Sequence, residues 1–292
     1  MSLFTGSCVA MVTPFNEEGI NFEALDRTVA FQIEQGTDAL LACGTTGEPA
    51  TMTREEKKSV IRYTVEKAAK RVPVLAGVGG NNTAEVVRAS VEAEGLGADA
   101  VLAVTPYYNK TNARGLVAHY REISEAVHIP VIIYNVPSRT GMNVTPAALK
   151  ELSGLKQIAG IKEASGNIAQ VLEMSRTCGG SVDIYSGNDN MVVPLLAAGG
   201  KGVISVVANI APRDTHQMVQ YFLEGNLKES LDLQLKLLPL IDALFCEVNP
   251  IPVKTAMNLM GFDMGPLRLP LADMAENNLS LLKRRMREYG LL

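Results

Sequence analysis

The chain has 292 residues, of which 47% are hydrophobic and 20% charged, and its formal net charge is -4. This length fits one α/β barrel or two smaller domains, and the slightly acidic balance disfavours a nucleic-acid-binding protein. The three histidines lack HxH or HExxH spacing and the four cysteines form no CxxC pair, which disfavours a metal-dependent hydrolase. The first residues show no charged leader before an apolar core, and no apolar run reaches membrane length, so we expect a cytoplasmic protein without membrane contacts.

Short β-rich apolar runs alternate with amphipathic segments of helical length along most of the chain. The expected strands are 7–15, 39–43, 72–78, 100–105, 130–136, 158–163, 182–186 and 202–208. The expected helices are 22–35, 54–70, 83–96, 112–127, 145–154, 168–178, 190–199 and 213–224. Because each crossover carries its own helix, these units predict a parallel sheet, and eight is the number that closes a TIM (β/α)8 barrel.

The junctions between the expected helices and strands contain residues that are typical of helix ends and helix starts. Gly36, Gly97 and Gly200 follow expected helices and lead directly into strands, and glycine suits the left-handed position after a helix. Thr53 stands three residues before Glu56 and fits a capping box, and the segment that starts at Asn82 fits one less closely. These signals support a repeated strand–helix unit.

The chain changes character past residue 224. No strand is expected there, and residues 227–245, 251–260 and 271–289 have the pattern of helices separated by Asn-Pro and Gly-Phe-Asp punctuation. The leucine-rich run that begins at Leu231 has too many apolar positions for a freely solvated helix. We therefore expect residues 1–224 to form a catalytic barrel and residues 225–292 a helical appendage packed on the barrel or on a partner subunit.

The run 158–163 ends in a lysine that stands directly before polar and glycine residues. Alternation along a strand places Gly160 and Lys162 on one face, and the glycine leaves room for the long lysine side chain. Apolar surroundings favour the uncharged amine, which can attack a carbonyl and form a Schiff base. The structural alternative is an ordinary lysine at a strand end that points into water.

Other polar residues follow the strands at the end where a TIM barrel carries its active site. The turn 44–48 offers two hydroxyls and backbone N–H groups, which suit a carboxylate. Tyr134 stands on the strand beside Lys162 and could move protons, and the hydroxyl of Thr45 could link it to a second tyrosine. Arg139 offers a planar fork for a second carboxylate, which indicates an anionic co-substrate.

Each of these residues also has a structural alternative. Tyrosines at strand ends often only pack, paired threonines in a turn often cap backbone groups, and Arg139 could be an exposed loop residue. Glu48 and Glu163 fit structural or solvated roles better than catalytic ones, and capping explains Asn81 and Glu85 at a helix start. The functional interpretation depends on the whole set meeting at neighbouring strand ends of one barrel.

Six motifs match a known family. They are Gly44-Thr-Thr-Gly-Glu48, Pro106-Tyr-Tyr-Asn109, Tyr134-Asn-Val-Pro-Ser-Arg-Thr-Gly141, Gly160-Ile-Lys-Glu-Ala164, Ser186-Gly-Asn-Asp189 and Asn249-Pro-Ile-Pro-Val-Lys254. On these motifs essentially the whole chain resembles the class I aldolase family of dihydrodipicolinate synthase and N-acetylneuraminate lyase. The doubled threonine and Ser138-Arg-Thr140 favour the synthase branch, because the lyase branch typically has Ser-Thr in the turn and no arginine at that place.

The resemblance implies that pyruvate is condensed with aspartate-4-semialdehyde to 4-hydroxy-tetrahydrodipicolinate, an early step of the diaminopimelate–lysine pathway. Lys162 would form a Schiff base with pyruvate, and Tyr134, Thr45 and Tyr108 would relay protons. In the family the tyrosine that matches Tyr108 reaches into the site of a neighbouring subunit. The resemblance implies neither a metal nor an organic cofactor, because the lysine is the electron sink.

The resemblance also assigns binding residues and an assembly. Thr46 would hold the pyruvate carboxylate and Arg139 the semialdehyde carboxylate, while Gly187 and the backbone carbonyl of Ile204 would line the pocket. The usual assembly of the family is a homotetramer built as a dimer of dimers. One departure is Asn188, which replaces the first of two aspartates that many relatives carry, and it puts an acid role at this position in doubt.

Some relatives are inhibited by lysine at a separate effector site. The matching positions here are Pro49, Ala50, Arg54, Lys57, Asn81, Glu85 and Tyr107. Pro49, Arg54 and Lys57 stand where lysine-sensitive relatives have a serine and two histidines. Added cations repel the ammonium of bound lysine by roughly 1 kcal/mol or more per close, partly buried charge. We therefore expect weak or no inhibition by lysine.

Two alternative functions fit parts of this pattern. The first is another pyruvate aldolase of the same barrel, which cleaves a 2-keto-3-deoxy sugar acid or N-acetylneuraminate and shares Lys162 and Tyr134. The second is a catalytically silent barrel with a binding or regulatory role. Assays of which second substrate is turned over distinguish the first alternative from the synthase. Failure to bind pyruvate would favour the second alternative.

Overall fold

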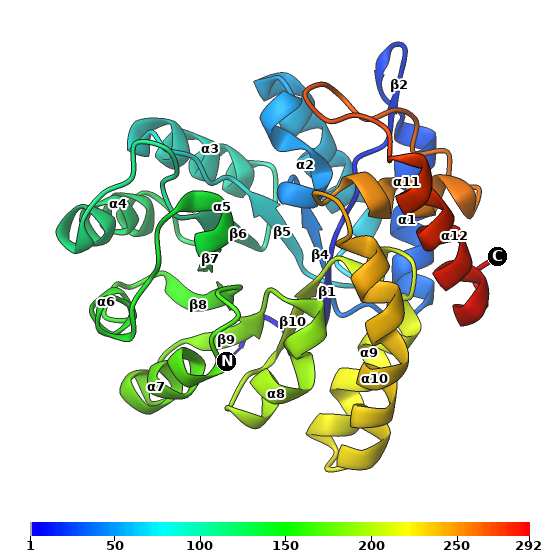
Figure 1. The fold of residues 1–292 in the computed structure, drawn as a ribbon. Helices are drawn as coiled ribbons and strands as arrows, with labels where there is room; N and C mark the ends of the chain where they lie inside the picture. Colours follow the sequence, from blue (N-terminus) through cyan, green and yellow to red (C-terminus); the bar gives the residue numbers. More distant parts are fainter. Residues whose placement is uncertain (1) are drawn as a thin grey trace.

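The computed structural model describes residues 2–292 and contains a closed barrel of parallel strands in the order β1-β10-β9-β8-β7-β6-β5-β4. The strands are β1 (Gly6–Ala10), β4 (Ala39–Ala42), β5 (Val74–Gly77), β6 (Ala100–Val104), β7 (Val131–Asn135), β8 (Ile158–Glu163), β9 (Asp183–Ser186) and β10 (Gly202–Ser205). Helices surround the barrel on all sides (Figure 1). The predicted TIM barrel is confirmed.

The outer helices match the amphipathic segments to within a few residues. They are α1 (Phe22–Glu34), α2 (Arg54–Ala68), α3 (Thr83–Gly95), α4 (Ala113–Ala126), α6 (Pro146–Leu152), α7 (Ile168–Cys178), α8 (Val192–Ala197) and α9 (Pro212–Leu223). The hairpin β2 (Phe15–Asn16) and β3 (Gly19–Ile20) and the short helix α5 (Pro137–Thr140) were not expected, because elements of two to four residues have no periodicity. Gly36 and Gly97 adopt positive φ, whereas Gly199 rather than Gly200 does so before β10.

The last barrel strand is shorter than its apolar run because a buried carboxylate ends it. The run 202–208 predicts a strand to its end, but β10 stops at Ser205. The backbone N–H groups of Val206 and Val207 donate to Oδ2 of Asp189 at 3.0 and 2.8 Å. These groups bind a side chain and are not available to a neighbouring strand, so the chain turns away from the barrel.

The first strand is also shorter than expected, for a similar reason. The run 7–15 predicts one strand, but β1 stops at Ala10. The N–H group of Val12 donates to Oδ1 of Asn209 at 3.1 Å, and Nδ2 of Asn209 donates to the carbonyl of Ala10 at 2.8 Å. Nothing in the local apolar pattern marks such a bond to a side chain on a distant segment.

Two hydrophobic layers hold the barrel. The interior contains small and branched side chains from alternate strand positions, among them Cys8, Leu41, Leu75, Ile132 and Ile204. The opposite faces of the strands pack against the helices in a separate buried layer. Since the strands are buried on both faces, they read as continuous apolar runs without strict alternation.

The C-terminal helices are α10 (Leu227–Leu244), α11 (Ile251–Leu259) and α12 (Glu276–Tyr289). Figure 1 shows α10 beside α9 and α12 at the edge of the molecule. Their buried residues, such as Ile241, Val253 and Leu282, form one cluster with Val12 and Val203 of the barrel side. The division of the chain at residue 224 stays a prediction.

The expected helix 271–289 is wrong at its start, because α12 begins only at Glu276. The N–H group of Ala275, the residue before the helix, donates to Oε1 of Glu247 at 2.9 Å. A side chain from a distant segment therefore binds the backbone at the point where the helix begins. Within residues 2–292 we find no helix with the length and apolar character needed to span a membrane.

The capping box at the start of α2 is confirmed. The Thr53 hydroxyl accepts from the N–H group of Glu56, and the Glu56 carboxylate accepts from the N–H group of Thr53. Both carboxylate oxygens of Glu56 also accept from the guanidinium of Arg268, at 2.6 and 3.0 Å. The bonds from Arg268 lower the pKa of Glu56 to about 2.

We expect the Arg268–Glu56 pair to stabilise the fold in a pH-dependent way. A carboxyl whose folded-state pKa is depressed contributes stability above its unfolded pKa of about 4.3, and this contribution is lost as the pH falls through about 2. Arg268→Met should therefore lower the free energy of unfolding by about 1 kcal/mol at pH 6, because the pair is partly exposed, and by less at pH 3. Urea unfolding of both proteins across this range is the measurement.

Arg285 provides a matched control, because it pairs with Glu288 on the outside of α12 at 2.6 Å. Arg285→Met should change the free energy of unfolding by less than about 0.5 kcal/mol at any pH. A difference between the Arg268→Met variant and the parent that stays constant from pH 6 to pH 3 would contradict the assignment.

Candidate active site

Lys162 and Tyr134 lie side by side at the C-terminal end of the barrel. They are direct partners in the register of β7 and β8, and both side chains are buried. The Lys162 Nζ atom lies 4.4 Å from the centroid of the Tyr134 ring. The amine is therefore held against an aromatic ring next to a phenol and does not extend into water.

The residues around the lysine show how β8 makes room for it. Gly160 faces the interior as expected, but a Cβ atom there would lie 2.8 Å from the backbone carbonyl of Asp183 and within 3.3 Å of the Ile132 and Tyr185 side chains, so these groups and not the lysine stem occupy its space. The room for the lysine stem comes from Gly187 at the end of β9. A Cβ atom on Gly187 would lie 3.2 Å from Lys162 Cε and 2.7 Å from the Ala164 side chain.

This contact predicts the effect of a single methyl group. Gly187→Ala should lower kcat/KM at least about tenfold, because the added methyl displaces the Lys162 stem, and overpacking should cost about 1–3 kcal/mol of stability. Steady-state rates and thermal unfolding of the variant are the measurements. Gly95→Ala is the control, because nothing lies within 4 Å of a Cβ atom there and activity should not change.

A cavity of about 580 Å³ opens above the lysine. Six of the predicted site residues line it, namely Thr45, Thr46, Tyr134, Arg139, Lys162 and Gly187. Thr45 and Thr46 belong to the 3-10 turn η1 (Thr45–Gly47) after β4, and Arg139 belongs to α5 after β7. Residues from four different strand ends therefore converge on one space, as is typical of TIM-barrel active sites.

The two predicted carboxylate-binding residues are held from the C-terminal region. The side-chain Nδ2 of Asn249 donates to the Thr46 hydroxyl at 3.1 Å. Arg139 Nη2 donates to the backbone carbonyl of Asn249 at 3.0 Å. Thr46 and Arg139, which both line the cavity, are thus linked through Asn249.

Two predicted residues do not reach this cavity within the chain. Tyr108 is 91% exposed and lines neither of the two cavities described here, and its φ angle is +67°. Ile204 is fully buried in the barrel interior, and Val206 lines the cavity in its neighbourhood. The roles given to Tyr108 and Ile204 stay predictions.

The comparisons with known proteins agree along the whole chain. The profile of the dihydrodipicolinate synthetase family matches residues 3–288. The chain belongs to the dihydrodipicolinate synthetase family.

Individual relatives place the chain within this family. A protein of Thermoanaerobacter sp. (strain X514), named 4-hydroxy-tetrahydrodipicolinate synthase, is 56% identical over all of this chain and 99% of its own length. A synthase of the same name from Clostridium perfringens is 53% identical over 99% of this chain and all of its own length. The crystal structure of dihydrodipicolinate synthase from Thermotoga maritima is 42% identical, with a TM-score of 0.97 over 99% of this chain and all of the other. The predicted family and enzyme class are confirmed.

Sequence reasoning missed one wall of the cavity in this dihydrodipicolinate synthetase family member. Residues 245–249, between α10 and α11, line the cavity together with Val206. The Asn249-Pro-Ile-Pro-Val-Lys254 motif was the one available signal, but nothing in the local pattern says which strand end it meets. Glu163, which was expected to be structural or solvated, is buried and accepts from Nδ2 of Asn135 at 2.8 Å and from the N–H group of Ser165 at 2.7 Å.

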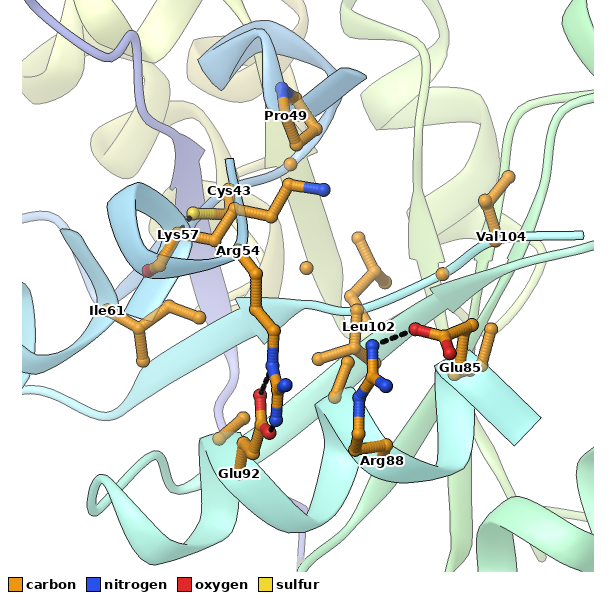
Figure 2. A pocket seen from close by; sticks show the side chains of 18 of the residues that line it. Cys43, Pro49, Arg54, Lys57, Ile61, Glu85, Arg88, Glu92, Leu102 and Val104 are labelled. Carbon is orange, nitrogen blue, oxygen red and sulfur yellow. Dashed lines mark hydrogen bonds and ion pairs between the residues drawn. The ribbon is translucent and has the colours of Figure 1, made fainter. Parts of the chain in front are cut away.

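A second cavity of about 360 Å³ lies between α2 and α3, and Thr45 and Tyr134 reach it from the active-site side. It is lined by six of the seven predicted effector-site residues, namely Pro49, Arg54, Lys57, Asn81, Glu85 and Tyr107, whereas Ala50 is exposed outside it. Figure 2 shows two ion pairs along its α3 side, one between Arg54 and Glu92 and one between Arg88 and Glu85.

Neither cavity, within the described residues, has a cluster of side chains that could bind a metal ion. Across residues 2–292, the structure brings no three His, Cys, Asp or Glu side chains into an arrangement that could bind one. Cys8 is fully buried in the barrel interior, and burial raises the pKa of its thiol. Cys43 and Cys178 are buried as well.

Proposed function

We propose that this chain condenses pyruvate with aspartate-4-semialdehyde to 4-hydroxy-tetrahydrodipicolinate through a Schiff base on Lys162. The observation that carries the proposal is the buried Lys162 amine beside Tyr134, in a cavity that also holds Thr46 and Arg139. The names of the relatives point to the same reaction. Two groups that can bind carboxylates, in the same cavity as one amine, suit two anionic substrates.

The proposed reaction uses only groups of the chain. The Lys162 amine adds to the keto carbon of pyruvate, and loss of water gives a Schiff base. Removal of a proton from the adjacent methyl group leaves an enamine, whose carbon attacks the aldehyde carbon of the second substrate. Tyr134 and Thr45 would move the protons of these steps. The amino group of the second substrate then attacks the Schiff-base carbon, which closes the ring of the product and returns the free Lys162 amine. The lysine nitrogen accepts the electron pair, so this route calls for no organic cofactor.

Two measurements test the proposal. Incubation with pyruvate, reduction with borohydride and digestion should yield a reduced pyruvyl adduct on the peptide that contains Lys162. Addition of both substrates should give the condensation product at a rate that Arg139→Ala lowers through the second substrate. An adduct on another lysine, or none, would overturn the mechanism, and turnover of a sugar acid in place of the semialdehyde would favour the lyase alternative.

We further propose that the active assembly contains at least two subunits, and that it is a homotetramer in the cytoplasm. The exposure of Tyr108 supports a role in a neighbouring subunit, because its side chain lines neither cavity of its own chain. One structure that is 42% identical is described as a monomeric dihydrodipicolinate synthase variant, so membership of the family does not by itself fix the assembly. Analytical ultracentrifugation at assay concentration is the test, and an active monomer would contradict the proposal.

We expect lysine to inhibit this enzyme weakly or not at all. Lys57 lines the second cavity and forms no ion pair within residues 2–292, so its ammonium would face that of a bound lysine. Glu85, the one carboxylate among the seven matching positions, is already paired with Arg88. Steady-state rates at increasing lysine concentration are the measurement, and half-inhibition below about 1 mM would contradict the expectation.

The same argument predicts that removing the Lys57 charge makes the enzyme more sensitive to inhibition by lysine. Lys57→His should lower the inhibitory concentration of lysine about fivefold at a pH where the imidazole is neutral, because a close like charge of about 1 kcal/mol is removed. Lys67→His is the matched control on the same helix, because Lys67 pairs with Asp26 at 2.8 Å outside the cavity. Equal responses of the two variants would show that Lys57 does not act at the cavity.

A further inference from the structure

The Asn249–Lys254 motif belongs to the C-terminal region, yet its first residue lies in the wall of the active-site cavity. Asn249 is 7% exposed, and its Oδ1 atom is buried without a hydrogen-bond partner. A buried amide that satisfies only one of its two ends costs free energy. Packing alone therefore does not explain why an asparagine stands here.

In its side-chain hydrogen bond to Thr46, Asn249 is the donor, and this determines what the Thr46 hydroxyl can do. Its Nδ2 donates to Oγ1 of Thr46 at 3.1 Å. A hydroxyl has one hydrogen to donate and two lone pairs. Since the amide N–H occupies one lone pair, the Thr46 hydrogen points elsewhere, and the cavity that Thr46 lines contains the proposed pyruvate site. The Thr46 hydroxyl is thereby free to donate its hydrogen to a substrate carboxylate, which can only accept.

The backbone of the same residue reaches the other proposed substrate group. The carbonyl of Asn249 accepts from Nη2 of Arg139 at 3.0 Å. Arg139 is otherwise an exposed side chain on a helix of four residues, so this bond limits where its guanidinium can lie. One residue therefore contacts both groups that are proposed to bind substrate carboxylates.

A buried ion pair also joins the segment of Asn249 to the turn that contains Thr46. Lys254 lies in the first turns of α11 and its Nζ binds Oε1 of Glu48 at 2.7 Å, with side-chain exposures of 1% and 0%. Glu48 follows Thr46 by two residues, and its other oxygen accepts from the N–H group of Arg268 at 3.0 Å. The threonine turn and the Asn249 segment are thus joined at two points.

Building on the proposed function, we propose that Asn249 is a positioning residue for both substrates. Its side-chain amide orients the Thr46 hydroxyl toward the pyruvate carboxylate, and its backbone carbonyl places Arg139 for the carboxylate of the second substrate. The C-terminal helical region would then be part of the substrate-binding machinery, beyond its contribution to the stability of the barrel.

Steady-state kinetics of Asn249→Ala and Asn249→Asp test the side-chain half of this device. Either change removes the amide donor, and the aspartate additionally attracts the Thr46 hydrogen to itself. We expect the KM for pyruvate to rise about three- to tenfold in both variants, with smaller changes in kcat. The KM for aspartate-4-semialdehyde should change less, because the backbone carbonyl that holds Arg139 remains.

A double-substitution cycle shows whether Asn249 acts through Thr46. Thr46→Val should raise the KM for pyruvate by itself, and adding Asn249→Ala to it should raise the KM little further. If Asn249→Ala does not fold, the isosteric Asn249→Asp takes its place in the cycle. Asn258→Ala is the control in α11, the helix that follows Asn249, because Asn258 donates to the carbonyl of Gly265 and does not line the cavity.

The outcomes separate this inference from the function on which it rests. A wild-type protein that does not turn over the two substrates overturns the proposed function. If the wild type is active, an unchanged KM for pyruvate in the Asn249 variants overturns the positioning role, as do additive effects in the cycle. A loss of thermal stability with unchanged KM, the result expected for Asn258→Ala, would assign Asn249 a purely structural role.

Discussion

Replacing Lys162 with methionine is expected to lower kcat/KM by about a thousandfold or more, because loss of a covalent nucleophile removes the whole route through the intermediate. The fold should survive, since the side chain is already buried beside Tyr134 and methionine has a similar length without the charge. The borohydride adduct with pyruvate should disappear together with the activity. Kinetics and mass spectrometry of the same preparation give both readouts.

Lys156 is the matched control for this substitution. It is exposed in the turn that precedes β8, at the opposite end of the same strand. Lys156→Met should keep the full rate and the full yield of adduct. A Lys162→Met protein that still condenses the substrates at more than a small fraction of the normal rate would rule out the Schiff base on this residue.

Replacing Lys254 with methionine is expected to cause the largest loss of stability, about 3–5 kcal/mol, because it leaves the Glu48 carboxylate buried without its cation. Burial lowers the pKa of Lys254 to about 8 even with this carboxylate beside it. The pair is therefore costly to bury, and removing both charges should be far less harmful than removing one. Lys254→Met combined with Glu48→Gln should recover most of the lost stability.

Urea unfolding of the single and double variants measures these differences. Lys228→Met is the control, because Lys228 pairs with Asp232 on the exposed side of α10 and should contribute less than about 0.5 kcal/mol. If Lys254→Met loses no more than this control, the pair is not a stabilising contact of the fold. If the double variant is as unstable as the single one, the loss arises from repacking around α11 and not from the unpaired charge.

Much of the barrel was predictable because its elements follow local rules. Residues 158–163 form a strand over the expected range, and α7 spans the expected residues 168–178. The ends of the first and last strands were not predictable. They depend on Asp189 and Asn209, whose side chains take over backbone N–H groups that the apolar pattern would assign to the sheet.

The amino-acid sequence by itself determined the eight strand–helix units, the family, and the placing of Lys162 and Tyr134 on neighbouring strands. All three follow from periodicity and motifs within short segments. Only the tertiary structure decided that Asn249 meets Thr46 and that Lys254 meets Glu48. These partners are 203 and 206 residues apart along the chain, and no local pattern specifies such a contact. It arises because closure of the barrel and packing of the C-terminal helices bring the two segments to the same rim.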